Sequence, residues 1–433
     1  MSLAITGRDH FRSLLRNRDL RLLLGAGLIS QTGDWILGTG IAFQIYALTG
    51  STLASAIVLL ATQAPQVLFG SFAGVLVDRW DRRRVMVVVN VLLGVVLLPL
   101  FLVRDASQAW IIFVVVAVSS CLTPFFAAAE VSLLPALVGA DDLVTANAVN
   151  AQVRNVSRLI GAALGGVIIA GGGLVWLAVV DLATFGLAAL LIGLVRHRPA
   201  PAGAPSLHLF QDWVEGLAVI KNSRVLVVIV FFFAVSGVGE AVMGTLFAPF
   251  VHDVLGGSGA AFGTILSAQA LGGIAGGLVI TVVGHRFSPR SLFAWGAVAF
   301  GIGDLALFLY PLLSPQVWPA IVIIALVGLP GAALFAGMLT LFQTDTPDQV
   351  RGRVYGVLIT VQNVAMLAST YVAGSLANHL GIVAVISTQG VVYLLAGVVV
   401  LLVLHASKNA TEPGRVGSGR VDQSVEPARQ GPP

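Results

Sequence analysis

Ionisable side chains lie inside several long apolar stretches of this sequence. A charge in such a stretch is energetically costly and usually has a functional role. Groups in such places pair with one another, contact a polar ligand or carry a proton. The candidates are Asp34, Glu130, Arg154, Arg158, Glu240 and Asp304.

The spacing of Arg154 and Arg158 places both guanidinium groups on one face of a helix. At about 1.5 Å of rise per residue, Asp34 and Arg158 lie at similar depth, and Glu130 and Arg154 share a shallower one. We therefore predict two ion pairs, Asp34 with Arg158 and Glu130 with Arg154. The alternative interpretation is that both pairs only hold helices together.

An internal repeat gives Asp34 and Glu240 equivalent positions. SQTGDWILGT from Ser30 to Thr39 matches SGVGEAVMGT from Ser236 to Thr245. A carboxyl group in a medium of low dielectric constant can take up and release protons near neutral pH. Both acids are therefore candidate proton carriers, and the alternative is a hydrogen-bonded contact between helices.

For two further acidic residues we predict structural roles. Asp304 lies in the middle of an apolar stretch, and we expect it to pack or form a hydrogen bond. Asp181 lies near the outer start of another stretch, and we expect it at the membrane interface.

The composition defines the surroundings of these residues. The 433 residues are 57% hydrophobic and 10% charged, with a mean hydropathy of +0.95. A soluble protein of this size must cover itself with more polar surface, so a soluble enzyme is excluded. The single cysteine, Cys121, excludes a disulfide scaffold. The composition indicates an all-α membrane protein.

Twelve apolar stretches are each long enough to cross a membrane as a helix. They are residues 19–47, 52–77, 84–103, 109–137, 144–171, 174–195, 224–252, 259–284, 290–310, 316–342, 352–377 and 381–405. Nearly all of the 24 Lys and Arg residues fall in the termini and in alternate loops. This asymmetry predicts that both termini are cytoplasmic.

The chain divides into two similar halves. Residues 1–196 and 224–405 form the N-terminal and C-terminal six-helix halves, and the repeat relates them by a pseudo-twofold axis. Residues 197–223 form a cytoplasmic linker with an amphipathic surface helix, and residues 406–433 form a disordered cytoplasmic tail. Repeats of this kind place a substrate site between the halves, which alternate in exposing it.

A loop with a distinctive charge pattern connects the second and third stretches. The loop GVLVDRWDRRR, from Gly74 to Arg84, resembles the G-x-x-x-D-R-x-x-R-R loop of the major facilitator superfamily. Other segments resemble the drug:proton antiporter branch, which holds macrolide and multidrug efflux proteins and enterobactin exporters. They are TGDW at Thr32–Trp35, LTGS at Leu48–Ser51, GAALGG at Gly161–Gly166 and RGRVYG at Arg351–Gly356. The resemblance covers nearly all of residues 10–405 and implies the major facilitator fold.

The resemblance also implies a role for the charged loop. It would be a latch that stabilises the outward-facing state, with Asp78 near the start of the eleventh span. The alternative is an ordinary basic cytoplasmic loop. The predicted gating residues are Gly74, Asp78, Arg79, Arg82 and Arg83.

Aromatic and polar residues of the spans are candidates for lining a substrate cavity, with ordinary core packing as the alternative. Such a cavity suits a bulky amphipathic or cationic molecule. The candidates are Gln31, Trp35, Phe43, Asn147, Gln343 and Asn363.

Other chemistry has no support in the sequence. There is no GxxxxGK[ST] run for nucleotide binding, and the seven histidines show no metal-ligand spacing. We therefore predict no enzyme activity, no cofactor, no metal and no nucleic-acid partner.

Together these features predict a monomeric, proton-coupled exporter of amphipathic small molecules, such as drugs, in a bacterial inner membrane. Its partners would be a small-molecule substrate, protons and the lipid bilayer. The alternatives are an exporter of a native metabolite such as a siderophore, a lysolipid flippase, and a membrane sensor or assembly protein without transport.

Overall fold

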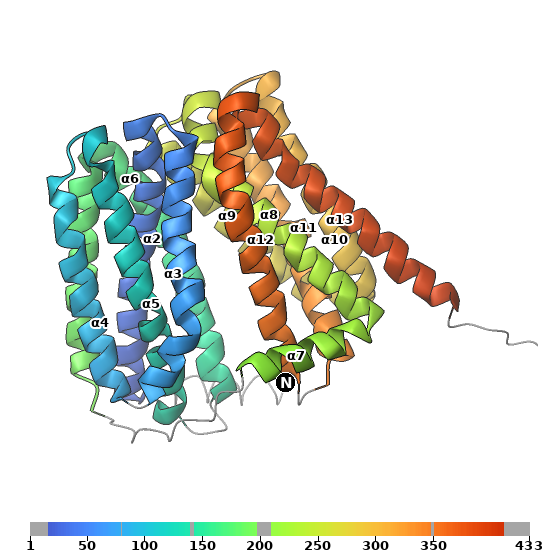
Figure 1. Cartoon of the computed structure of the whole chain (residues 1–433), viewed down its shortest axis with the longest axis horizontal. Coiled ribbons are helices and arrows are strands. Elements are labelled where there is room, and N and C mark those ends of the chain that lie inside the picture. Colours follow the sequence, from blue (N-terminus) through green and yellow to red (C-terminus); the bar gives the residue numbers. More distant parts are fainter. Residues whose placement is uncertain (1–15, 79, 139–142, 197–208, 348–349, 411–433) are drawn as a thin grey trace, which may run out of the picture.

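The computed structural model describes residues 16–78, 80–138, 143–196, 209–347 and 350–410. Every regular element among these residues is helical, as the sequence predicts. The long helices form two groups that lie side by side, and the short helix α7 (Leu209–Lys221) lies crosswise at one end of the second group (Figure 1).

The first group contains the helices of the N-terminal half. They are α2 (Arg18–Thr49), α3 (Thr52–Asp78), α4 (Arg82–Leu97), α5 (Ala109–Leu137) and α6 (Leu143–Gly193). Helix α6 consists of two arms that meet at Gly173, where φ is 68° and ψ is −170°. Glycine reaches this backbone conformation without steric cost, so the chain reverses there with almost no loop.

The second group contains the helices of the C-terminal half. They are α8 (Arg224–Pro249), α9 (Gly259–Val283), α10 (Pro289–Leu309), α11 (Val317–Asp345), α12 (Arg351–Leu380) and α13 (Ile382–Ala410). Serine side chains begin three of them, because Ser223, Ser258 and Ser288 each accept a backbone N–H of the first turn.

Ten helices among the described residues are long and apolar enough to cross a membrane. The stretch Gln152–Gly193 counts as one of them although it has two arms, and α2, with polar residues such as Gln31 and Asp34, is not among the ten. The expected twelve spans are reached only when α2 and both arms of α6 are counted.

Each group of helices has its own apolar core. One cluster of buried side chains lies within α2–α6, a second lies within the C-terminal half together with Ile220 of α7, and a third joins Phe43 of α2 to the C-terminal half. Large apolar side chains also point outward, as Leu68 on α3 and Leu326 on α11 do with exposed fractions of 64% and 69%. Such a surface fits surrounding lipid, so the chain is a multi-pass membrane protein.

The two groups touch at the end opposite α7. Helix α7 lies against the start of α12 through an ion pair between Glu215 and Arg353. Near the other end of α12, Thr52 Oγ1 donates hydrogen bonds to the Gly374 carbonyl at 2.7 Å and to Asn378 Oδ1 at 2.8 Å. The protein is therefore held closed at the end away from α7.

Glycines allow a second contact at the closed end. A Cβ on Gly166 of α6 would lie 2.5 Å from the Gly259 carbonyl oxygen and 2.8 Å from the Gly263 Cα. The backbones of α6 and α9 thus touch directly, which only residues without a side chain permit.

Candidate functional site

A cavity of about 740 Å³ lies between the two groups of helices. One wall comes from the first arm of α6, and the others come from α8, α9, α10 and α11. Its polar lining includes Gln152, Asn155, Arg158, Glu240 and Gln269, and its apolar lining includes Ile274, Leu278, Phe300, Val327 and Phe335. An apolar wall with a few convergent polar groups is typical of small-molecule sites.

Arg158 connects the two halves across this cavity. Its Nη2 atom donates a 3.0 Å hydrogen bond to Gln269 Oε1 on α9. Its guanidinium carbon also lies 5.3 Å from the centre of the Trp35 ring on α2, a cation–π contact. The guanidinium and the Glu240 carboxyl interact electrostatically. Arg158 thus places a positive charge where the two halves face each other.

The predicted ion pair between Asp34 and Arg158 is wrong. The side chain facing Arg158 is Trp35, and successive residues of a helix point about 100° apart. Asp34 therefore turns away from Arg158. The two residues have similar depths, but depth along a helix does not determine the direction in which a side chain points.

Asp34 faces a separate cavity of about 230 Å³ inside the N-terminal half. This cavity, which we name the N-half cavity, is enclosed by α2, α3, α4, α5 and the second arm of α6. Its polar lining is Asp34, Thr62, Gln66, Ser119, Ser120, Thr123 and Asp181.

The expected interfacial position of Asp181 is also wrong, because its side chain is fully buried. Asp181 follows Gly173 by eight residues, which places it about 12 Å along the helix from the turn. Its Oδ1 atom accepts a 3.0 Å hydrogen bond from Thr184 Oγ1, and its Oδ2 atom has no partner among the described residues. The feature of the sequence that could have indicated this position is an acidic residue within an apolar stretch.

The second predicted ion pair is present. Arg154 Nη1 lies 3.8 Å from Glu130 Oε2, with exposed side-chain fractions of 52% and 6%. This pair links α5 to the first arm of α6 within the N-terminal half. Its partly exposed arginine compensates the charge of a carboxyl group that is itself buried.

Asp304 has the hydrogen-bonding environment that was expected. It is buried on α10, and its Oδ2 atom accepts a 3.0 Å hydrogen bond from Gln389 Nε2 on α13. The contact joins two helices of the C-terminal half, away from the N-half cavity.

The charged loop lies against helix ends of the N-terminal half. Arg82 donates to the Ser132 carbonyl at 3.2 Å, and Arg83 Nε donates to the Ile192 carbonyl at the end of α6, also at 3.2 Å. Arg82 thus ties the charged loop to α5, and Arg83 ties it to the end of α6. Arg79 lies outside the described residues, as do the side chain of Asp78 and the surroundings of Gly74.

The predicted cavity residues are dispersed. Trp35 contacts Arg158, whereas Phe43 is buried at the closed end between the rings of His252 and Phe262. Gln343 is exposed at the end of α11, where its carbonyl accepts from Arg351.

The other predicted cavity residues have no place in the lining described above. Gln31 and Asn363 are half-buried on α2 and α12, and the side chain of Asn147 is outside the described residues. The lining residues Gln152, Asn155 and Gln269 were missed. The spacing of Gln152, Asn155 and Arg158 on one face of α6 could have identified two of them.

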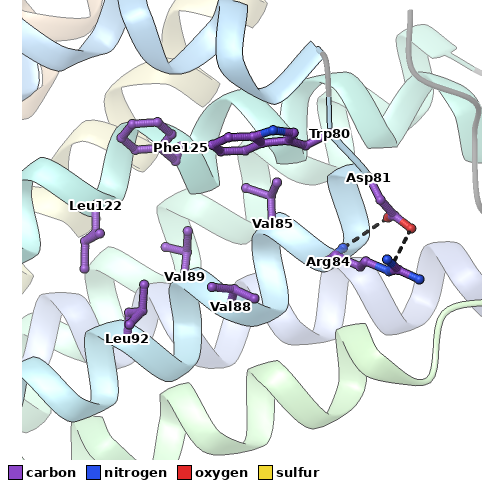
Figure 2. Close-up of a pocket in the computed structure, with 9 residues that line it drawn as sticks. All are labelled: Trp80, Asp81, Arg84, Val85, Val88, Val89, Leu92, Leu122 and Phe125. Carbon is purple, nitrogen blue, oxygen red and sulfur yellow. Dashed lines mark hydrogen bonds and ion pairs between the residues drawn. The ribbon is translucent and has the colours of Figure 1, made fainter.

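A third hollow lies on the outer surface of the N-terminal half, between α4 and α5 (Figure 2). It measures about 670 Å³ and is lined mainly by valine, leucine and aromatic side chains, with Trp80 above and the ion pair of Asp81 and Arg84 at one end. Val88 and Trp80 are exposed by 54% and 50%. This groove therefore faces the surrounding lipid and is separate from the cavity between the halves.

The sequence matches a known family over nearly its whole length. The model of the MFS_3 family, described as transmembrane secretion effector, matches residues 12–430. The chain belongs to this family. It is thus a member of the major facilitator superfamily, as the charged loop predicts.

Named relatives are exporters. The multidrug efflux pump Tap of Mycolicibacterium fortuitum is 27% identical over 394 residues, which cover 88% of this chain and 94% of the relative. The enterobactin exporter EntS of Escherichia coli O1:K1 / APEC is 28% identical over 406 residues, covering 90% and 93%.

Solved structures share the fold. A bacterial homologue of the iron transporter ferroportin in an inward-facing state has a TM-score of 0.70 at 17% identity and covers 89% of this chain and 98% of its own. A bacterial homologue of the lysosomal transporter Spinster, also inward-facing, has a TM-score of 0.67 at 14% identity, covering 90% and 98%.

Proposed function

We propose that this protein is a proton-coupled exporter of amphipathic small molecules, drugs among them, in the inner membrane of a bacterium. The observation that carries the proposal is the cavity between the halves, where apolar walls surround the Arg158, Glu240 and Gln269 side chains. Such a lining can hold an apolar body and a polar or charged group of the same molecule.

Alternating access explains how the cavity would export its cargo. With both termini and α7 in the cytoplasm, the closed end of this structure faces outward and the cavity accepts cargo from inside. Rocking of the halves would break the contacts of Thr52 with α12 and release the cargo outside. No second copy of the chain is needed for this cycle, and we propose that a monomer performs it.

Proton coupling would supply the energy for uphill export. Glu240 lies in the cavity wall within electrostatic reach of Arg158, so a proton on Glu240 would weaken that interaction. Cargo and proton would then compete for the same charged pair.

Flux measurements in proteoliposomes test the proposal. An imposed pH gradient should drive uphill movement of a fluorescent amphipathic cation, and Glu240→Gln should abolish the uphill component while downhill movement continues. Flux that ignores the pH gradient would support a uniporter or a lysolipid flippase. Absence of flux for every cargo tried would support a sensor or assembly protein.

A native metabolite of the siderophore class is the second candidate cargo. The relative named enterobactin exporter EntS favours it, and Arg158 could contact an acidic group of such a molecule. Comparison of enterobactin with the amphipathic cation in the same proteoliposomes separates the two cargo classes.

A further inference from the structure

The N-half cavity contains two acids and, among its described lining residues, no basic side chain. Asp34 enters it from α2, and Asp181 enters it from the second arm of α6. The two carboxyl groups interact electrostatically. The Arg158 guanidinium cannot compensate them, since it is engaged with Trp35 and Gln269.

The position of Asp181 depends on a glycine of α2. A Cβ on Gly33 would lie 2.2 Å from Asp181 Oδ1 and 2.1 Å from Thr184 Oγ1, far inside contact distance. The missing side chain of Gly33 thus lets the Asp181 carboxyl group lie against α2, one residue from Asp34.

One oxygen of this fully buried acid has no partner. Thr184 satisfies Asp181 Oδ1, while Oδ2 has no hydrogen bond among the described residues. An unpartnered carboxylate oxygen away from water is strongly unfavourable unless it gains a proton or a donor.

Two like charges in a medium of low dielectric constant cannot both persist at close range. A single proton removes the repulsion, because the protonated acid no longer carries charge. The charge of the pair then falls from −2 to −1, and the proton leaves again to water. We propose that Asp34 and Asp181 together form one proton-binding site, so that Asp181 is a second proton-carrying residue of the exporter.

This site would communicate with the cargo cavity through α2. Asp34 lies in the N-half cavity, and the next residue, Trp35, contacts Arg158 in the wall of the cavity between the halves. The inference rests on the proposed proton coupling, to which it adds a second location for the proton.

Infrared titration of the purified full-length protein tests the pair without a transport assay. The wild-type protein should show a protonated-carboxyl band whose pH midpoint moves by about one pH unit or more in Asp34→Asn and in Asp181→Asn, since interacting acids titrate together. Asp304→Asn is the matched control, because it removes a buried acid with its own Gln389 partner and should leave this midpoint unchanged. A midpoint attributed to Asp181 that does not move in Asp34→Asn would overturn the proposal.

A second pair of variants tests the geometry in the same titration. Gly33→Ala should displace the Asp181 carboxyl group and change the same band, whereas Gly25→Ala on the same helix meets no atom within 4 Å and should not. If sodium or calcium ions added at constant pH removed the band, the site would bind a cation instead of a shared proton.

Transport measurements separate this inference from the proposed function. Asp181→Asn should reduce uphill cargo movement driven by a pH gradient at least tenfold and leave downhill movement within twofold of wild type. Full uphill transport by Asp181→Asn would reject the pair and keep proton-coupled export. Absence of pH-driven flux in the wild-type protein would reject the coupling, while the infrared titration would still decide whether the two acids share a proton.

Discussion

Asp34 and Trp35 are neighbours in the chain, yet they serve different cavities. The Asp34 side chain lines the cavity inside the N-terminal half, and the Trp35 ring lies 5.3 Å below the guanidinium of Arg158 in the wall between the halves. Helix α2 therefore lines the N-half cavity and also contacts a lining residue of the cavity between the halves, so a small rotation of α2 would affect both.

Replacement of Arg158 should weaken cargo binding. Arg158→Gln removes a charge-assisted hydrogen bond to Gln269 and the contact with Trp35, which together amount to about 1.5–3 kcal/mol. We expect KM for an amphipathic cargo with an acidic group to rise about 10- to 100-fold. Concentration-dependent uptake into inverted vesicles measures this change.

Arg104→Gln is the matched control for that variant. Arg104 is exposed in the turn between α4 and α5, far in the chain from the cavity residues. Its replacement should leave KM unchanged, and an equal rise in both variants would show that overall charge, and not the cavity contact, controls binding.

Loss of Arg154 and loss of Glu130 from their ion pair should destabilise the N-terminal half to different extents. Arg154→Gln leaves the Glu130 carboxylate buried without its partner, whereas Glu130→Gln leaves an arginine that is 52% exposed and solvated. We expect Arg154→Gln to lower the free energy of unfolding more than Glu130→Gln does, by up to about 3 kcal/mol against about 1 kcal/mol. Thermal unfolding in detergent gives the comparison.

A charge exchange completes the test of this pair. The double variant Glu130→Arg with Arg154→Glu should recover part of the lost stability because opposite charges still face each other. Equal destabilisation by both single variants, with no recovery in the double variant, would argue against a direct pair.

The glycine contact between α6 and α9 should control closure of the end opposite α7. Gly166→Ala places a Cβ 2.5 Å from the Gly259 carbonyl oxygen, so the helices must separate. We expect transport to fall at least tenfold and the distance between spin labels on α6 and α9 at this end to increase, since closely packed backbones tolerate no added methyl group.

Gly186→Ala on the same helix is the control for this contact. Its Cβ would meet no atom within 4 Å, so both transport and the spin-label distance should remain as in the wild type. An unchanged distance in Gly166→Ala would mean that the closed end adapts to the methyl group.

Arg83 should stabilise the end of α6 at the charged loop. Its side chain donates to the carbonyls of Ile192 and Gly193 at the end of α6. Arg83→Gln should lower the free energy of unfolding by about 1–2 kcal/mol. Arg84→Gln should have a smaller effect, because that side chain is 77% exposed in its pair with Asp81. Thermal unfolding of the two variants under identical conditions decides between them.

The sequence predicted the helices and one ion pair well, because both depend on distances along the chain. Apolar length defines where a helix crosses the membrane, and equal depth brought Glu130 to Arg154. The fold class followed from composition, and the family followed from the charged loop.

Rotation of helices about their axes was the information that the sequence lacked. A membrane helix has apolar residues on the lipid side and on the packed side, so hydropathy does not indicate which way Asp34 points. Likewise the depth of Asp181 was misjudged, since an acid near a predicted turn was assumed to face the interface when it lies about 12 Å further along the helix. The Gly33 contact, a three-dimensional feature, determines its actual position.

The abrupt reversal at Gly173 has a practical consequence for mapping membrane sidedness. Because the two arms of α6 meet at a single glycine, that point offers no spare chain for an epitope or a protease site, and an insertion would pull the arms apart. The exposed residues Arg104 and Asp105 lie between α4 and α5, outside any helix, and can take an insertion without dividing one. A reporter placed there would reveal which compartment the closed end of the protein meets.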